Sequence, residues 1–201
     1  MRFNQSTPPI ILASTSITRR QLLARLNVPF DVISPEIDET PIEGESAQTL
    51  ASRLAEQKAS VVSSQFPHAL VIGSDQVVWI ANQPEIFLGK PLTAPRAYEQ
   101  LRKLSGQLVH FETAINVQCQ QLNINKTELV RYLVHFRTLS ATEIQRYVAF
   151  DQPYYSAGSI KAEGLGISLF EAMHGEDFTA LLGLPLIKLS HMLRDVGWPS
   201  P

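Results

Sequence analysis

The sequence predicts an α/β protein, arranged as one sizeable domain or as two closely packed lobes. A chain of 201 residues is long enough to bury a substantial core. Short apolar runs of strand character alternate with segments whose apolar residues recur at helical spacing. Two long β-rich runs follow, at residues 107–120 and 123–137, and they resemble a ribbon or the long strands of a second lobe.

Composition excludes several classes of protein. The chain has 17 Lys and Arg against 19 Asp and Glu, a formal net charge of -2, so no global basic field attracts nucleic acid or an anionic membrane. Residues 1–9 lack the apolar stretch of an export signal, and no later run approaches membrane-spanning length. A lone cysteine, Cys119, excludes an internal disulfide and a cysteine-cluster metal site. We therefore expect a soluble, cytoplasmic protein with no nucleic-acid or membrane partner.

The first unit is a strand, a polar loop and a helix. Residues 10–13 read as a short buried strand, and the helix that follows carries Leu22, Leu23 and Leu26 on one face. Either Ser16 caps this helix, or Thr18 does so in a capping box.

Arg19 and Arg20 fall in the first helical turn with either cap. Two cations there oppose the positive end of the helix dipole, and an anion docked beside them would relieve this. The alternative is a pair of solvated surface arginines. Arg19 shares the face of the buried leucines, so we favour the anion site.

An acidic loop follows the predicted strand at residues 30–33. Its carboxylates, Glu36, Asp38 and Glu39, lie between two prolines. This loop is a hydrated turn, unless one of its acids faces Asp75, in which case the two could hold Mg²⁺.

Residues 46–65 form the most clearly predicted helix. Lys58 lies on its apolar stripe, four residues after Leu54 and four before Val62. Its ammonium must emerge beside something negative, either a carboxylate or a phosphate, or it simply reaches solvent along the core.

Residues 70–80 are the stretch around which the chain is organised. Four strand-forming residues end at Gly73, and a second β-rich run begins after Asp75, so we expect a sharp break at this acid. A carboxylate between core segments is costly unless it has a partner or a task. The alternative is a tight hairpin turn at Ser74 and Asp75.

The remaining elements follow in order. Residues 81–87 read as a polar connection, and Gly89 and Pro91 present Lys90 on a fixed loop without the glycine spacing of a Walker A motif. Thr93 caps a helix that stops at Gly106, and a capping box at residues 140–143 starts another. A glycine-rich stretch at 154–170 precedes an amphipathic C-terminal helix; Lys161 and Glu163 share a side if that stretch is extended.

Together these motifs resemble the Maf family of nucleoside-triphosphate pyrophosphatases, in order and over nearly the whole chain. The matching residues are Ile11-Leu12-Ala13-Ser14-Thr15-Ser16 with Arg19-Arg20, Asp38-Glu39, Lys58-Ala59, Gly73-Ser74-Asp75-Gln76-Val77, Gly89-Lys90-Pro91, Leu104-Ser105-Gly106 and Gly183-Leu184-Pro185.

The resemblance implies an elongated mixed sheet flanked by helices, two lobes around a nucleotide cleft, and a homodimer. It also implies hydrolysis of a nucleoside triphosphate to the monophosphate and pyrophosphate with a divalent cation, Mg²⁺ or Mn²⁺. Asp75 would accept the proton of the attacking water, Glu39 would bind metal, and whether Asp75 also ligates the metal stays open. Phosphates would be held by Ser14, Arg19, Arg20, Lys58 and Lys90.

With Gln76 and Glu163 at these positions, the sequence resembles the branch of the family that acts on 7-methyl-GTP rather than the one that acts on dTTP and UTP. A carboxylate at Glu163 can accept hydrogen bonds from a guanine edge and offset the positive charge of the methylated ring. Thr18 stands where that branch commonly has tryptophan, so stacking on the base would fall to another aromatic residue, Trp79, Phe87 or Tyr154. The alternatives are a pyrophosphatase for dTTP, UTP or another modified nucleotide, and a non-catalytic nucleotide-binding regulator of cell division.

Overall fold

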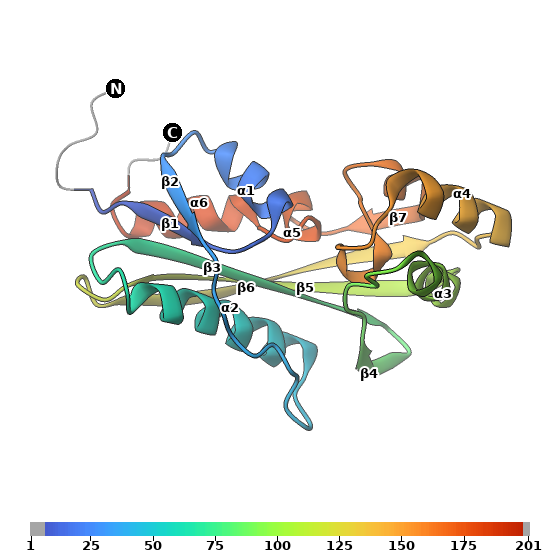
Figure 1. The fold of residues 1–201 in the computed structure, drawn as a ribbon, viewed down its shortest axis with the longest axis horizontal. Helices are drawn as coiled ribbons and strands as arrows, with labels where there is room; N and C mark the ends of the chain where they lie inside the picture. The colour runs from blue at the N-terminus through green and yellow to red at the C-terminus, as the bar shows by residue number, and fades with distance from the viewer. Residues whose placement is uncertain (1–6, 199–201) are drawn as a thin grey trace.

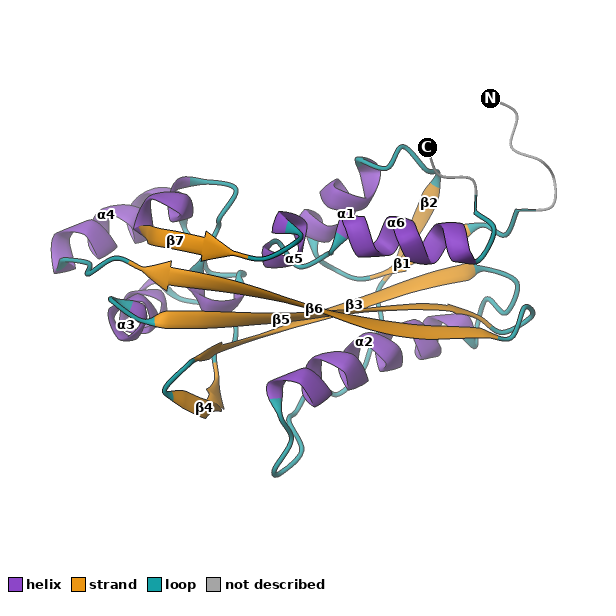
Figure 2. Ribbon diagram, turned by 180° about the vertical axis from the view of Figure 1, so that it is seen from behind, coloured by secondary structure: helices purple, strands orange, loops and turns teal. Residues whose placement is uncertain are grey.

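The computed structural model describes residues 7–198 and contains one mixed, seven-stranded sheet with helices on both faces (Figures 1 and 2). The strand order is β2-β1-β3-β5-β6-β7, and β4 pairs with the far end of β3. β1 is parallel to β2 and β3, and every other pairing is antiparallel. The predicted α/β class with an elongated mixed sheet is confirmed. The strands are β1 (Ile10–Ala13), β2 (Phe30–Ile33), β3 (Leu70–Ile80), β4 (Gln83–Phe87), β5 (Leu108–Cys119), β6 (Ile124–Phe136) and β7 (Phe170–His174).

One helix covers one face of the sheet, and the others pack on the opposite face. The covering helix is α2 (Ala47–Ser63), which lies below the strands in Figure 1. Within the described residues, no helix is both long and apolar enough to cross a membrane. The remaining helices are α1 (Ile17–Ala24), α3 (Ala94–Leu104), α4 (Ala141–Asp151), α5 (Phe178–Leu181) and α6 (Leu186–Asp195), with the 3₁₀ turns η1 (Ala157–Ser159) and η2 (Leu165–Leu169).

Separate hydrophobic clusters occupy the opposite ends of the face that carries most of the helices. One packs α1 and α6 against Leu70 and Ile72 of β3. The other packs α3 and α4 against Val78 and Ile80 of the same strand. The strands β3 and β5 contribute to both clusters, so the sheet itself joins the two ends of the molecule.

The expected break at Asp75 is wrong, and so is the alternative of a hairpin turn there. β3 runs without interruption through Gly73, Ser74 and Asp75. Gly73 serves helix packing instead: a Cβ at this position would lie 2.2 Å from the carbonyl oxygen of Ala55 and 2.8 Å from the amide nitrogen of Ala59. Glycine is therefore needed for the close approach of α2 to the strand.

One further expectation is corrected, and two alternatives that the sequence left open are decided. Residues 81–87 are not merely a connection, because most of them form β4, an edge strand paired with the end of β3. The segment at 154–170 is not extended but folds into η1, η2 and intervening turns. Of the two possible caps of α1, Ser16 is the one used, since its hydroxyl accepts a hydrogen bond from the amide of Arg19.

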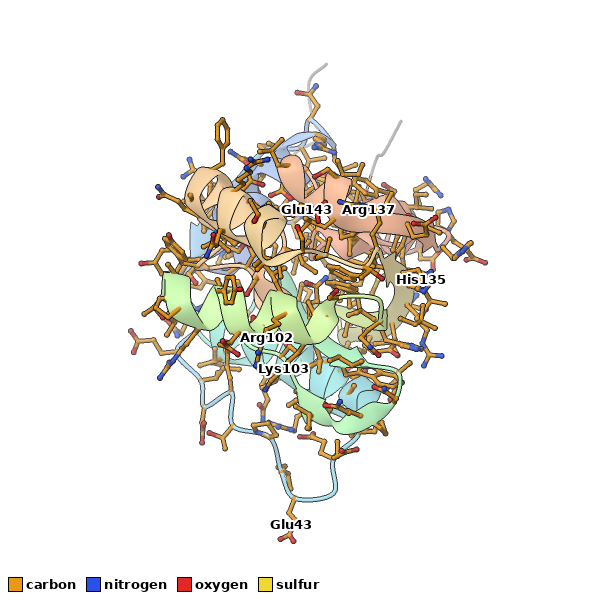
Figure 3. The ribbon with its side chains drawn as sticks, turned by 90° about the vertical axis from the view of Figure 1, so that its right-hand side faces the viewer. Glu43, Arg102, Lys103, His135, Arg137 and Glu143 are labelled. Carbon is orange, nitrogen blue, oxygen red and sulfur yellow. The ribbon has the colours of Figure 1, made fainter. Side chains whose placement is uncertain are left out.

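The capping box at Ser140 is confirmed and has a pH dependence of its own. Glu143 accepts hydrogen bonds from the backbone and hydroxyl of Ser140 and from Arg137, which lies beside it in Figure 3. These contacts lower the pKa of Glu143 from 4.5 to about 2, and the hydrogen bonds from Ser140 have the largest effect. The ionised carboxylate therefore stabilises the fold above about pH 4.5, and this contribution is lost as the pH falls toward 2.

Glu143→Gln is expected to remove this pH-dependent contribution. The difference in unfolding free energy between wild type and variant should be constant above about pH 5 and should shrink as the pH falls toward 2. Urea unfolding at a series of pH values measures it. A difference that stays constant down to pH 2 would contradict the assignment to Glu143.

Candidate active site

The candidate site lies where β3 has a neighbouring strand on one side alone. β1 pairs with β3 only as far as Ala13 opposite Gly73, and β4 begins to pair at Trp79. Over residues 74–77, β5 flanks one side of β3, and no strand of the described chain flanks the other. β1 and β4 lie toward opposite ends of β3 in Figure 1, which leaves this part of its edge for side chains and loops.

At this edge, Lys58 is held between two carboxylates. Its Nζ donates to Asp75 Oδ1 at 2.6 Å and lies 2.7 Å from Glu39 Oε1. Lys58 and Asp75 are only 5% and 7% exposed, whereas the Glu39 side chain is 57% exposed. An ammonium group has several donors and no acceptor, so it can bind both acids at once. These two ion pairs of Lys58 therefore hold α2, β3 and the acidic loop next to one another.

Arg19 and Lys90 also act on Glu39. Burial raises the pKa of Glu39, but the hydrogen bond and charge of Lys58, with the charges of Lys90 and Arg19, outweigh this and hold that pKa below its usual value. Burial lowers the pKa of Arg19, while Asp75 and Glu39 raise it and offset part of the effect. The structure therefore places Arg19 and Lys58 near both Glu39 and Asp75, and Lys90 near Glu39.

Local structure fixes Arg19 from both ends. Its amide donates to Ser16 Oγ at 3.3 Å, and Ser14 Oγ in turn accepts from the amide of Ser16 at 3.1 Å. The guanidinium Nε donates to the carbonyl of Gly183 at 2.8 Å. Ser14 itself is buried at the end of β1.

The loop that carries Lys90 is fixed by the segment after α4. The amide of Leu92 donates to the carbonyl of Tyr154 at 2.9 Å, and the amide of Gly158 to the carbonyl of Gly89 at 3.4 Å. Lys90 is exposed between these bonds. Its ammonium is therefore free to meet an anionic ligand, although its loop is held in place.

Other predicted site residues lie differently. Arg20 is exposed and lines a surface groove between α1 and β2, so it points away from its neighbour Arg19. The side-chain amide of Gln76 donates to Thr113 Oγ1 and to the carbonyls of Ala180 and Leu181, which directs it toward α5. Thr18 is half-buried in the first turn of α1.

Glu163 is exposed in a turn beside α4. Burial raises the pKa of Tyr147, and the charges of Asp151 and Glu163 raise it further. Lys161 donates through Nζ to the carbonyl of Asp151 at 2.6 Å. Because the segment is folded into turns, Lys161 and Glu163 do not project from one face, as they would if it were extended.

The aromatic residues considered for base stacking have partners within the protein. Trp79 stacks on His110 with ring centroids 4.0 Å apart. Phe87 packs beside the core under α2, and Tyr154 beside the core of α3 and α4.

Sequence reasoning missed the turn at the end of α5. The carbonyl of Gly183 accepts from Arg19, 164 positions away in the chain, and Thr113 Oγ1 donates to the carbonyl of Ala180 in the same turn. The only signal was the motif Gly183-Leu184-Pro185, which by itself suggests no more than a helix start.

The carboxylates suit a divalent cation only in company with a ligand. Within residues 7–198, no group of at least three His, Cys, Asp or Glu side chains is placed to hold a metal. Glu39 and Asp75 supply two carboxylates that face the same ammonium. Mg²⁺ commonly takes one or two carboxylates and completes its shell with water and phosphate oxygens, so the donor set fits a metal bound together with a phosphorylated substrate.

Comparisons with known proteins agree on one family. A family model described as "Maf-like protein" matches residues 9–196. A nucleoside triphosphate pyrophosphatase of Acinetobacter baylyi is 49% identical over 96% of this chain and 97% of its own length. Proteins named 7-methyl-GTP pyrophosphatase from Polaromonas and Nitrosococcus oceani are 49% and 46% identical, over 94% and 96% of this chain and 85% and 95% of their own lengths.

Among solved structures, the Ham1 protein of Staphylococcus aureus aligns with a TM-score of 0.43 and 16% identity, over 64% of this chain and 71% of that chain.

Proposed function

The chain belongs to the Maf-like protein family, and from this premise we propose that it hydrolyses 7-methyl-GTP to 7-methyl-GMP and pyrophosphate. The names of several close relatives support this substrate. The observation that carries the chemistry is the placement of Lys58 between Asp75 and Glu39, with Arg19 and Lys90 near enough to influence Glu39. Cations beside paired acids match the needs of phosphoanhydride cleavage.

In this mechanism Asp75 accepts a proton from the attacking water. A new bond forms between the water oxygen and the α-phosphorus, the α–β bridging P–O bond breaks, and pyrophosphate leaves with the bonding electrons. Lys58 binds Asp75 through Oδ1, which leaves Oδ2 for the water. Arg19, Lys58 and Lys90 bind the phosphate oxygens and neutralise their charge.

A divalent cation, Mg²⁺ or Mn²⁺, would be held by Glu39 and Asp75 and would supply Lewis-acid polarisation of the phosphate when bound. Ser14 completes the proposed phosphate contacts, and Arg20, which the family resemblance also implies as a phosphate ligand, would have to turn from its groove between α1 and β2 to join them. Thr18, Gln76 and Glu163 are proposed to set the base preference, with Glu163 as the acceptor for the guanine edge.

A substrate panel tests the proposal. Purified protein is incubated with 7-methyl-GTP, GTP, dTTP and UTP in the presence of Mg²⁺ or Mn²⁺, and released pyrophosphate is measured. We expect kcat/KM for 7-methyl-GTP to exceed that for dTTP and UTP at least about tenfold, because a polar site discriminates strongly between base edges. A preference for the pyrimidine nucleotides would reject the substrate. Nucleotide binding without pyrophosphate release would support the regulatory alternative.

We also propose that the protein is a cytoplasmic homodimer, which rests on the family resemblance. Size-exclusion chromatography with light scattering measures the assembly directly: a mass of about twice 22.4 kDa supports the dimer, and a mass near 22.4 kDa contradicts it.

A further inference from the structure

The short segment 180–183, which ends α5, is held on the sheet by side chains rather than by strand pairing. Gln76 Nε2 donates to the carbonyls of Ala180 at 2.8 Å and Leu181 at 3.2 Å. Thr113 Oγ1 donates to the same Ala180 carbonyl at 2.9 Å. These donors stand on β3 and β5, so the turn is attached to the two central strands.

The carbonyl of Gly183 lies within hydrogen-bond distance of two side-chain donors. Ser74 Oγ lies 2.9 Å from this oxygen, and Arg19 Nε donates to it at 2.8 Å. Ser74 is fully buried, and its single hydroxyl proton is shared between the Gly183 carbonyl and the carbonyl of Ala114 at 2.8 Å. Gly183 has a φ of +96°, and a Cβ there would lie 3.4 Å from Arg19 Nε, so the backbone conformation and the nearby guanidinium both favour glycine.

This arrangement constrains the guanidinium without using up its donors. Arg19 donates only the N–H of Nε to Gly183, and the N–H groups of its terminal nitrogens remain available to bind an anion. A long arginine side chain loses considerable rotamer freedom when it binds a ligand, and a fixed anchor reduces that loss at the binding step. Ser74 stands next to Asp75 in the chain but points to the opposite face of β3, because successive strand residues alternate.

We propose that Ser74 is a positioning residue that acts through the carbonyl of Gly183 to orient Arg19 toward the substrate's phosphates. Thr113 has a second, parallel part in this role, because it holds Ala180 of the same turn. The inference rests on the proposed function, since it needs a phosphorylated substrate at Arg19. It assigns Ser74 and Thr113 a task in the reaction without any contact with the reacting atoms.

A double-mutant cycle tests the proposal with 7-methyl-GTP as the probe. Ser74→Ala is measured for kcat and KM in the wild-type background and in the Arg19→Ala background. We expect kcat/KM to fall about tenfold in the first and less than about twofold in the second, because an effect that acts through Arg19 disappears with it. An equal loss in both backgrounds would overturn the proposal. Thr113→Val gives a second cycle with the same expectation if Ser74→Ala does not fold.

Ser63→Ala is the matched control, because it also removes a buried hydroxyl. Ser63 lies on α2, and its Oγ has no hydrogen-bond partner in the described chain. Its kcat/KM should equal that of wild type. The cycle separates the two hypotheses: a wild-type protein that releases no pyrophosphate refutes the proposed function, whereas an active wild type with independent Ser74 and Arg19 effects refutes the positioning role alone.

Discussion

Asp75→Asn is expected to lower kcat about 10³-fold while leaving the fold intact. Asparagine keeps the shape of the side chain and loses its basicity, and general-base catalysis commonly contributes 10² to 10⁴ in rate, so about 10³ is a central value. The amide oxygen of the variant can still accept from Lys58, and Glu39 remains as a second partner of that ammonium. Pyrophosphate release at saturating substrate measures the loss.

Circular dichroism and thermal unfolding should show that the variant is folded. Asp195→Asn is a suitable control, since Asp195 lies on the surface in an exposed ion pair with Lys126, and its kcat should not change. An Asp75→Asn variant within about tenfold of wild type would remove Asp75 from the role of proton acceptor.

Gly73→Ala is expected to lower the free energy of unfolding by about 3 kcal/mol, at the upper end of usual overpacking costs. The new Cβ would meet backbone atoms of α2, 2.2 Å from the Ala55 oxygen, and a backbone cannot move aside as a flexible side chain can. The helix must shift away from β3, and Lys58 would move with it. We therefore expect pyrophosphatase activity to fall together with stability, as measured by urea unfolding and a turnover assay.

The matched variant is Gly89→Ala. A Cβ at Gly89 would have no heavy atom within 4 Å, so its stability should stay within about 0.5 kcal/mol of wild type. If Gly73→Ala unfolds at the same urea concentration as wild type, the close helix–strand contact does not stabilise the protein as the structure indicates.

Local patterns predicted the elements whose reasons are local. The strand at residues 10–13, the helix at 46–65 and the capping box at Ser140 all depend on neighbours within a few positions, and all appear in the structure. The role of Gly73 does not follow from local sequence, because its neighbour in space is α2, and nothing in the adjacent sequence distinguishes a packing glycine from a turn glycine. β4 was missed because Pro84 and Glu85 are unusual in a strand and tolerable at an edge.

The candidate site likewise has features that follow from local sequence and features that depend on residues far away in the chain. The position of Lys58 on an apolar helical stripe left open whether its ammonium meets a carboxylate, a phosphate or solvent, and the geometry places it against Asp75 and Glu39. The anchoring of Arg19 could not be predicted, because a backbone carbonyl carries no sequence signature. The roles of these residues in turnover remain predictions for the experiments above.

The two hydrophobic clusters share strands, and this limits how the molecule can move. Leu70 and Val78 belong to different clusters yet lie on the uninterrupted β3, and β5 likewise runs from one cluster to the other. Domains joined by a flexible linker can rotate as rigid bodies, but these two ends have no such hinge. Any closure of the site around a bound nucleotide must therefore come from twisting of the long strands or from movement of surface loops. This architecture does not allow a large rigid-body rotation of one end against the other.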